Sequence, residues 1–306
     1  MALDDGRKRW IAAIFVVVTV WFMSVVIAGL ASVFSSTSSM ETGNVAIIPI
    51  KGMITTEESD SLFGEEVATS SSVIKMIDEA DSNQLIKAII LEINSPGGTP
   101  VATDEISQRI KKLQKPNVAY IREIGTSGAY WVASSADYVI ANRMSITGSI
   151  GVIGSYLEFS GLIERYNVSY ERLVSGKYKD IGSPWKENSP EERMVLQTSI
   201  DLIGSYFIDE VAKNRNMTRE RAATLATGQF YVGGEAIKLG LIDELGGKDE
   251  AIRYIENKTG IKAKTVEYKK KKGLLSMLSE ATSSNAYQIG RGIGSSIVNS
   301  EIIRLR

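Results

Sequence analysis

Serine and lysine are the side chains of this sequence that could carry nucleophilic chemistry, because it contains no histidine and no cysteine. A hydrolase built from it cannot use a Ser-His-Asp triad or a Cys-His pair. Ser127, in the run Gly125 to Trp131 (GTSGAYW), follows an apolar stretch and opens a predicted helix. There its hydroxyl would lie near the positive end of the helix dipole, among free backbone N–H groups. An ordinary N-cap serine produces the same pattern.

A base for such a serine could come from the segment SGKYKDIGSP, residues 175–184, which holds Lys177 and Lys179. Lysine can replace histidine when burial or nearby charge keeps its amine neutral. Lowering a lysine pKa from about 10.4 to about 7.5 takes roughly 4 kcal/mol of differential solvation. A pocket closed by Tyr178, Ile181 and Trp185 could supply it. Either lysine alone could equally be a solvated surface residue.

Two glycine-containing stretches could complete a catalytic site. The turn NSPGG, residues 94–98, follows a buried strand pattern and lets backbone N–H groups converge, as an oxyanion hole requires. A tight turn that needs positive φ explains the same glycines. The stretch TGSIGVIG, residues 147–154, lacks the Gly-Lys-Ser/Thr ending of a phosphate loop. Ser149 could instead orient a lysine amine, although packing of a glycine-rich strand is the simpler interpretation.

Composition narrows the partners and cofactors. The 306 residues suffice for one large domain or two small ones. With 35 basic and 36 acidic residues the net charge is −1, so nothing indicates a nucleic-acid partner. The lack of cysteine excludes disulfides, thiolate zinc sites and iron–sulfur clusters. No dense Asp/Glu cluster with ligand spacing is present, so we expect no metal and no cofactor.

The N-terminal region predicts a membrane anchor. Residues 10–34 contain no charge and are long enough, as a helix, to cross the hydrocarbon core of about 30 Å. Arg7, Lys8 and Arg9 precede them, which predicts a cytoplasmic segment 1–9 and a catalytic domain on the extracytoplasmic side of the cell membrane. A cleaved signal peptide is the alternative, but its apolar region usually has about 7–15 residues.

The rest of the chain predicts an α/β domain between two polar segments. Residues 35–43 form a Ser/Thr-rich linker, residues 44–268 the domain, and residues 269–306 a basic, flexible C-terminal tail. Within the domain, strand and helix patterns alternate, which predicts a parallel sheet with crossover helices. The expected strands are 44–54, 86–93, 117–121 and 137–141, and the expected helices 73–80, 101–113, 127–136 and 190–214.

The motifs NSPGG, TSGAYW, TGSIGV, SGKYKDIGSP and GQFYVGGEAIKLGLIDELGG occur in this order along residues 94–247. Together they resemble the signal peptide peptidase A family of membrane-anchored serine peptidases. The resemblance implies a ClpP/crotonase-like α/β fold, a parallel-sheet spiral with crossover helices, preceded by one N-terminal transmembrane helix. It also implies a homo-oligomer that degrades remnant signal peptides and similar apolar peptides without a cofactor.

The resemblance assigns roles to individual residues. It implies Ser127 as nucleophile and Lys179, rather than Lys177, as general base. Ser149 matches the serine that supports the lysine, and the backbone amides of Gly97 and Gly128 match the oxyanion region. Family members often carry Ala-Ser-Gly-Gly-Tyr around the nucleophile, whereas this chain has Thr at 126 and Ala at 129. That departure leaves open the shape of the pocket for the residue before the cut.

Three other functions share parts of this pattern. A stomatin-associated Ser/Lys peptidase would act on apolar helices of a partner protein, and the SGKYKDIGSP motif favours the first family over it. A ring-forming scaffold would use the fold without catalysis. A crotonase-type acyl-CoA enzyme would share the fold, but export across the membrane would separate it from CoA.

Overall fold

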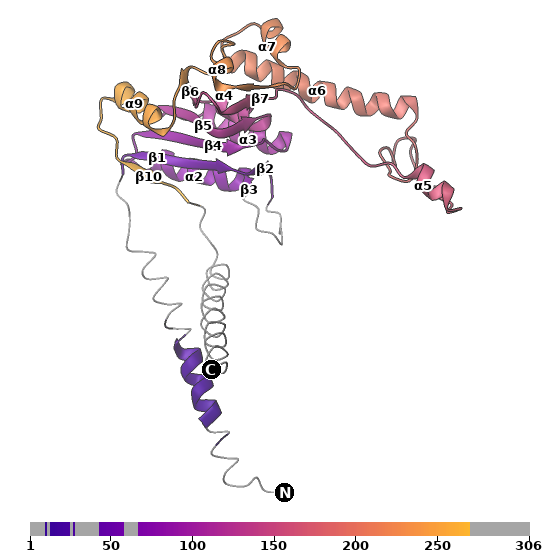
Figure 1. Ribbon diagram of the computed structural model, residues 1–306, viewed down its shortest axis with the longest axis horizontal. Coiled ribbons are helices and arrows are strands. Elements are labelled where there is room, and N and C mark those ends of the chain that lie inside the picture. The colour runs from indigo at the N-terminus through magenta and orange to yellow at the C-terminus, as the bar shows by residue number, and fades with distance from the viewer. Residues whose placement is uncertain (1–9, 11–12, 25–26, 28–42, 58–66, 270–306) are drawn as a thin grey trace, which may run out of the picture. The chain divides into compact units, whose positions relative to one another are not determined.

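A computed structural model of the chain describes residue 10, residues 13–24, residue 27, and residues 43–57 and 67–269 (Figure 1). Residues 43–269 form one compact unit. In the N-terminal segment, residues 13–24 are helical with exposed apolar side chains, among them Phe15 and Trp21.

The described residues contain no helix that is both long and apolar enough to cross a membrane. The structure therefore does not support the transmembrane helix predicted over residues 10–34. Positions 11–12, 25–26 and 28–34 of that prediction lie outside the described residues, as do segment 1–9, residues 35–42 of the linker and residues 270–306 of the tail.

A mostly parallel sheet forms the centre of the compact unit. Its strands lie in the order β10-β1-β4-β5-β6-β9, and every neighbouring pair in that order is parallel. β7 pairs with the carboxyl end of β5 and, antiparallel, with β8. The prediction of a mixed α/β domain is confirmed, and the sheet is compatible with a ClpP/crotonase-like fold. The strands are β1 (Val45–Lys51), β4 (Ala88–Ser95), β5 (Asn117–Thr126), β6 (Val139–Ala141), β7 (Ile146–Gly148), β8 (Phe230–Val232), β9 (Glu244–Leu245) and β10 (Thr265–Glu267).

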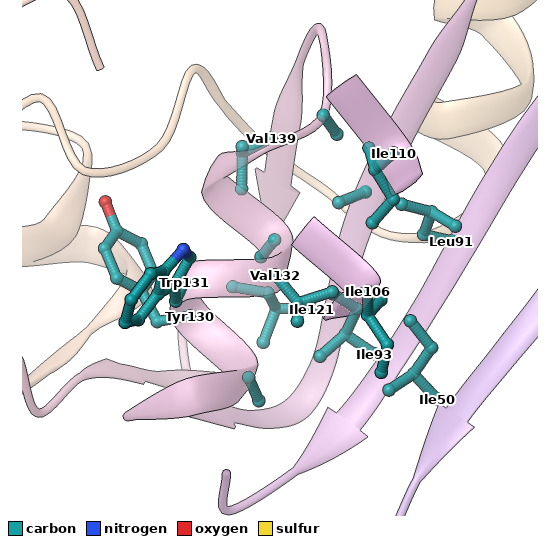
Figure 2. Close-up of a cluster of buried hydrophobic side chains, with 14 of the residues drawn as sticks. Ile50, Leu91, Ile93, Ile106, Ile110, Ile121, Tyr130, Trp131, Val132 and Val139 are labelled. Atoms are coloured by element: carbon teal, nitrogen blue, oxygen red, sulfur yellow. The ribbon is translucent and has the colours of Figure 1, made fainter. Parts of the chain in front are cut away.

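Helices cover both faces of the sheet, which explains why long runs of its central strands are apolar. α2 (Ser70–Ser82), α3 (Pro100–Lys111) and α4 (Gly128–Ser134) pack on one face, and α9 (Lys248–Thr259) packs on the other. In β4, Leu91 therefore packs toward α3 while its neighbour Ile90 packs toward α9. Figure 2 shows Ile106 and Ile110 of α3 beside the strand residues, with Val132 of α4 close to them.

The strand predicted over residues 44–54 is divided at Gly52, whose φ of 72° ends β1. β2 (Met53–Thr55) then leaves the main sheet and pairs with β3 (Val67–Thr69). A single parallel bridge joins Ile54 to Gly98 of the NSPGG turn. The turn is thus attached to the end of β4 through the chain and to β2 through this bridge.

The helix expected over residues 190–214 is present as α6 (Pro190–Asn214). Its start is fixed by a capping box, in which Ser189 and Glu192 bond each other's backbone amides. Only the carboxyl end of α6 reaches the core, where Phe207 stacks on Trp131 of α4 at 5.0 Å between ring centroids. α7 (Arg219–Leu225) and α8 (Gly233–Ala236) follow it.

Residues 152–188, which we call the arm, connect the sheet to α6 and contain the short helix α5 (Ser160–Arg165). Figure 1 shows α5 well away from the sheet, near the amino end of α6. Large apolar side chains of the arm are exposed, with Ile153 91% and Leu173 97% accessible. Inside the arm, the ring centroids of Phe159 and Trp185 lie 5.9 Å apart, and the Phe159 N–H donates to the Pro184 carbonyl.

Candidate active site

Ser127 occupies a strained turn between β5 and α4. Its φ of 52° and ψ of −128° lie in a region that residues with a side chain rarely adopt. Two backbone bonds hold it there: its N–H donates to the Gly148 carbonyl at 2.8 Å, and its carbonyl accepts from the Trp131 N–H at 3.1 Å. Such a strand-to-helix turn presents a nucleophile at the edge of a sheet. The Ser127 hydroxyl makes no hydrogen bond within the described part of the chain.

The NSPGG turn packs directly against this serine, and the glycines make that approach possible. A Cβ on Gly97 would lie 2.9 Å from both the Gly128 nitrogen and the Ser127 Cβ. A Cβ on Gly128 would lie 2.4 Å from the Thr103 hydroxyl oxygen. Real Cβ contacts are not that short, so any larger residue at these positions would push the two turns apart.

Two backbone amides beside Ser127 have no hydrogen-bond partner among the described residues. The Gly97 N–H is already used, since it donates to the Ser95 hydroxyl at 3.1 Å. The N–H groups of Gly98 and Gly128 have no acceptor among the described residues, and a Cβ on Gly128 would be 3.3 Å from the Gly98 nitrogen. Gly98, which the sequence interpretation did not select, is therefore the better placed donor. The sequence contained both glycines, but it could not show which amide the Ser95 hydroxyl occupies.

Ser149 is brought to the same site. β7 pairs with β5 so that Gly148 lies opposite Thr126. The next residue, Ser149, has a φ of 51° and donates its N–H to the Gln229 carbonyl at 2.8 Å. Ser127 and Ser149 consequently line one pocket of about 800 Å³.

That pocket has a largely apolar wall, which extends from Ser127 along α6. Space of this size is enough for several side chains of an extended peptide. The apolar wall residues come from α4, from the chain between β7 and the start of the arm, and from α6: Trp131, Ile150, Val152, Ile153, Ile200, Ile203, Phe207 and Ile208.

Lys179 does not line this pocket. It lies in a turn of the arm, where its N–H donates to the Gly176 carbonyl at 3.2 Å, and its side chain is exposed. Its ammonium group makes no ion pair or hydrogen bond with any described residue. A single chain therefore does not bring Ser127 and Lys179 together.

Lys177 has a different environment from Lys179. Its ammonium is hydrogen-bonded to Glu191 and lies 5.2 Å from the centre of the Tyr178 ring. The bond to Glu191 raises the pKa of Lys177, with Tyr178 adding to the effect. Since a general base must be neutral before it can take a proton, this pairing disfavours Lys177 as a base.

No group of three or more acidic side chains in the described ranges is arranged to hold a metal ion.

Comparison with known proteins shows the family to which the chain is related. The profile of peptidase family S49 matches residues 109–262, a range that includes Ser127, Ser149 and Lys179. MJ0651 of Methanocaldococcus jannaschii, a protein named as a protease, is 32% identical over 81% of this chain and 80% of its own length. Protease 4 of Haemophilus influenzae is 31% identical over 69% of this chain, and the chloroplastic serine protease SPPA of Arabidopsis thaliana is 30% identical over 83%. The chain spans 34% and 37% of those two longer relatives.

Proposed function

This chain belongs to peptidase family S49, and from that premise we propose that it is a serine endopeptidase in which Ser127 is the nucleophile and Lys179 the general base. The membership bears out the resemblance read from the ordered motifs. The observation that carries the proposal is the strained Ser127 turn, with an unbonded hydroxyl, two free amides beside it and an apolar pocket in front of it.

We propose remnant signal peptides and similar apolar peptides as substrates. The wall formed by Trp131, Ile150 and Phe207 can bury apolar side chains, and each one fully buried contributes about 1.5–3 kcal/mol to binding. Two charged residues, Asp201 and Arg219, also line the pocket. The serine protease SPPA of Arabidopsis thaliana supports the proposed serine peptidase activity.

The proposed reaction uses the serine, the lysine and the backbone amides of the site. Ser127 attacks the peptide carbonyl while neutral Lys179 takes its proton, and the N–H groups of Gly98 and Gly128 hold the oxyanion. Protonated Lys179 then gives its proton to the departing amine, which leaves an acyl-enzyme. Lys179 next takes a proton from water, and the resulting attack releases the peptide acid and frees Ser127. Ser149 is proposed to hold the lysine amine in this position.

Because Lys179 stands outside the pocket of its own chain, we propose that a second copy of the chain completes each site. The arm that carries Lys179 also exposes Ile153 and Leu173, which a solvated surface would not favour. Docking the arm against a neighbour would bury this apolar surface and remove water from the lysine amine. A closed ring of identical chains satisfies every arm in this way.

For location, we propose the extracytoplasmic side of the cell membrane. The support is the uncharged stretch 10–34 behind Arg7, Lys8 and Arg9. Added protease should digest the domain in cells whose outer layers have been permeabilised but whose cell membrane is intact, while a cytoplasmic marker stays undigested. Digestion only after lysis would reject this placement.

The test of the activity is labelling of Ser127 by a fluorophosphonate probe, followed by cleavage of a purified, released signal peptide. Wild-type protein should give both, and Ser127→Ala neither. A protein that is folded and assembled but unlabelled would be a scaffold rather than an enzyme. A labelled protein that cuts only an apolar helix of a partner protein would belong with the stomatin-associated type.

A further inference from the structure

The turn that carries Lys179 is surrounded by ion pairs that do not include Lys179. Its neighbour Asp180 accepts from Arg172 through both carboxylate oxygens, at 2.5 Å from Nε and 2.8 Å from Nη2. The Asp180 side chain is 11% accessible and that of Arg172 is 39% accessible, so this is a bidentate pair near the surface whose carboxylate is largely covered.

Other charged groups face the turn from the remaining sides. Lys186 donates to Glu192 at 2.6 Å, and its Nζ lies 3.9 Å from Asp180 Oδ1. From the first turn of α6, Glu191 binds Lys177. A further pair, Arg193 with Glu187 at 2.7 Å, lies at the same end of α6.

The arrangement matters because Asp180 is the residue next to Lys179 in the chain. A carboxylate without a cationic partner there would favour the charged ammonium form of the lysine, and an ammonium cannot accept a proton. Arg172 prevents this by occupying both oxygens of Asp180. The hydrogen bond from Arg172 is also the main reason why the pKa of Asp180 lies below its usual value, so the carboxylate stays ionised and bonded to the arginine at working pH.

We propose that Arg172, with Lys186 beside it, is a positioning residue for catalysis: it keeps the Asp180 carboxylate engaged, so that Lys179 enters the neighbouring site without an anionic partner of its own. This inference rests on the proposed role of Lys179 as general base. It assigns a function to the Asp180 part of the SGKYKDIGSP segment, which the reaction itself does not use.

The decisive measurement is the pH dependence of kcat/KM in two variants that change the charge beside Lys179 in opposite senses. Arg172→Gln removes a positive charge and leaves Asp180 with Lys186 as its remaining cationic neighbour, so the acidic limb of the profile should move to higher pH. Asp180→Asn removes the negative charge and leaves Arg172 unpaired, so the limb should move to lower pH. Shifts of about 0.3–0.7 pH units are expected, the size that fits a pair near the surface.

Two further variants separate electrostatics from simple damage to the fold. Arg172→Lys keeps the charge and should restore most of the wild-type profile. Arg193→Gln makes the same charge change at the same end of α6, but its partner is Glu187, so the limb should stay in place. Loss of activity in Arg172→Gln and Asp180→Asn without opposite shifts would overturn the proposal.

A second readout does not depend on catalysis. In the assembled Ser127→Ala protein, the Cε resonance of Lys179 can be followed by NMR as the pH is raised, with and without Arg172→Gln. A higher titration midpoint with Arg172→Gln supports the proposal, and an unchanged midpoint refutes it. If Lys179→Ala hydrolyses peptides at the wild-type rate, the proposed base is wrong, and the titration still decides whether Arg172 controls the charge of this lysine.

Discussion

Mixing two inactive variants tests whether the catalytic pair forms between chains. Ser127→Ala keeps Lys179 on its arm, and Lys179→Ala keeps Ser127 in its strained turn. Neither variant chain has both the serine and the lysine, so a site formed within one chain stays inactive in any mixture. A site formed between chains becomes active wherever a Lys179→Ala pocket meets the arm of a Ser127→Ala neighbour.

The size of the effect follows from counting. With equal amounts and random assembly, half of the pockets retain the serine and half of the docking arms retain the lysine, so about a quarter of the sites should be complete. Each variant alone should lose at least about a thousandfold in kcat, as expected when one member of a nucleophile–base pair is removed. The mixture should then exceed either parent by at least about two orders of magnitude.

The assay is hydrolysis of an internally quenched apolar peptide after the two chains are co-expressed and purified together. Ser127→Ala mixed with the double variant Ser127→Ala/Lys179→Ala is the matched control, because it offers no serine and should remain inactive. A stable mixed assembly that stays at the level of its parents would refute a dyad shared between chains.

Three other outcomes follow from the structure. Lys177→Ala should retain at least about a third of wild-type kcat/KM, because its amine is engaged by Glu191, whereas Lys179→Ala should not; the reverse ranking would identify Lys177 as the base. Gly98→Ala should lower stability by about 1–3 kcal/mol and abolish hydrolysis, since its Cβ would lie 1.8 Å from the Ile54 carbonyl oxygen; Gly161→Ala, with nothing within 4 Å, is the control and should match wild type in thermal melting and activity. Tyr120→Phe should lower the free energy of unfolding by about 1–2 kcal/mol in urea titrations, because Glu92 loses its 2.6 Å hydroxyl donor. Burial works to raise the pKa of Glu92, but the hydrogen bonds from Tyr120 and Lys51 outweigh it, and the pKa lies below the ordinary 4.5. The stability difference between wild type and Tyr120→Phe should therefore be full above pH 4.5 and shrink as the pH falls further. A constant difference in stability down to about pH 2 would contradict this cause.

The sequence predicted the elements whose signals are local. The Ser-Pro-Glu-Glu run placed the start of α6 correctly, because capping depends on four consecutive residues. The apolar run around Leu91 and Ile93 predicted a buried strand, because this signal also lies in consecutive residues. Ser127 was expected at the start of a helix, and the structure has it directly before α4.

What the sequence could not provide depends on residues far apart in the chain. The short strand β10 pairs with β1, more than two hundred residues away, and its three residues are too few to show a strand pattern. The division of the first predicted strand at Gly52 depends on β3, with which β2 pairs. The choice between Gly97 and Gly98 as an oxyanion donor depends on where one hydroxyl, that of Ser95, finds its partner.

The separation of the proposed nucleophile and the proposed base has a physical consequence. Ser127 is held by backbone bonds within one chain, so its geometry costs nothing further at the moment of reaction. A lysine in water is the opposite case, because at neutral pH solvation keeps it charged and unable to accept a proton. If the arm delivers Lys179 to an apolar pocket on another chain, the same contact that assembles the ring also removes the water that protected the charge. Catalysis would then depend on assembly through the desolvation of one amine, and an isolated chain with an intact serine turn would remain inactive.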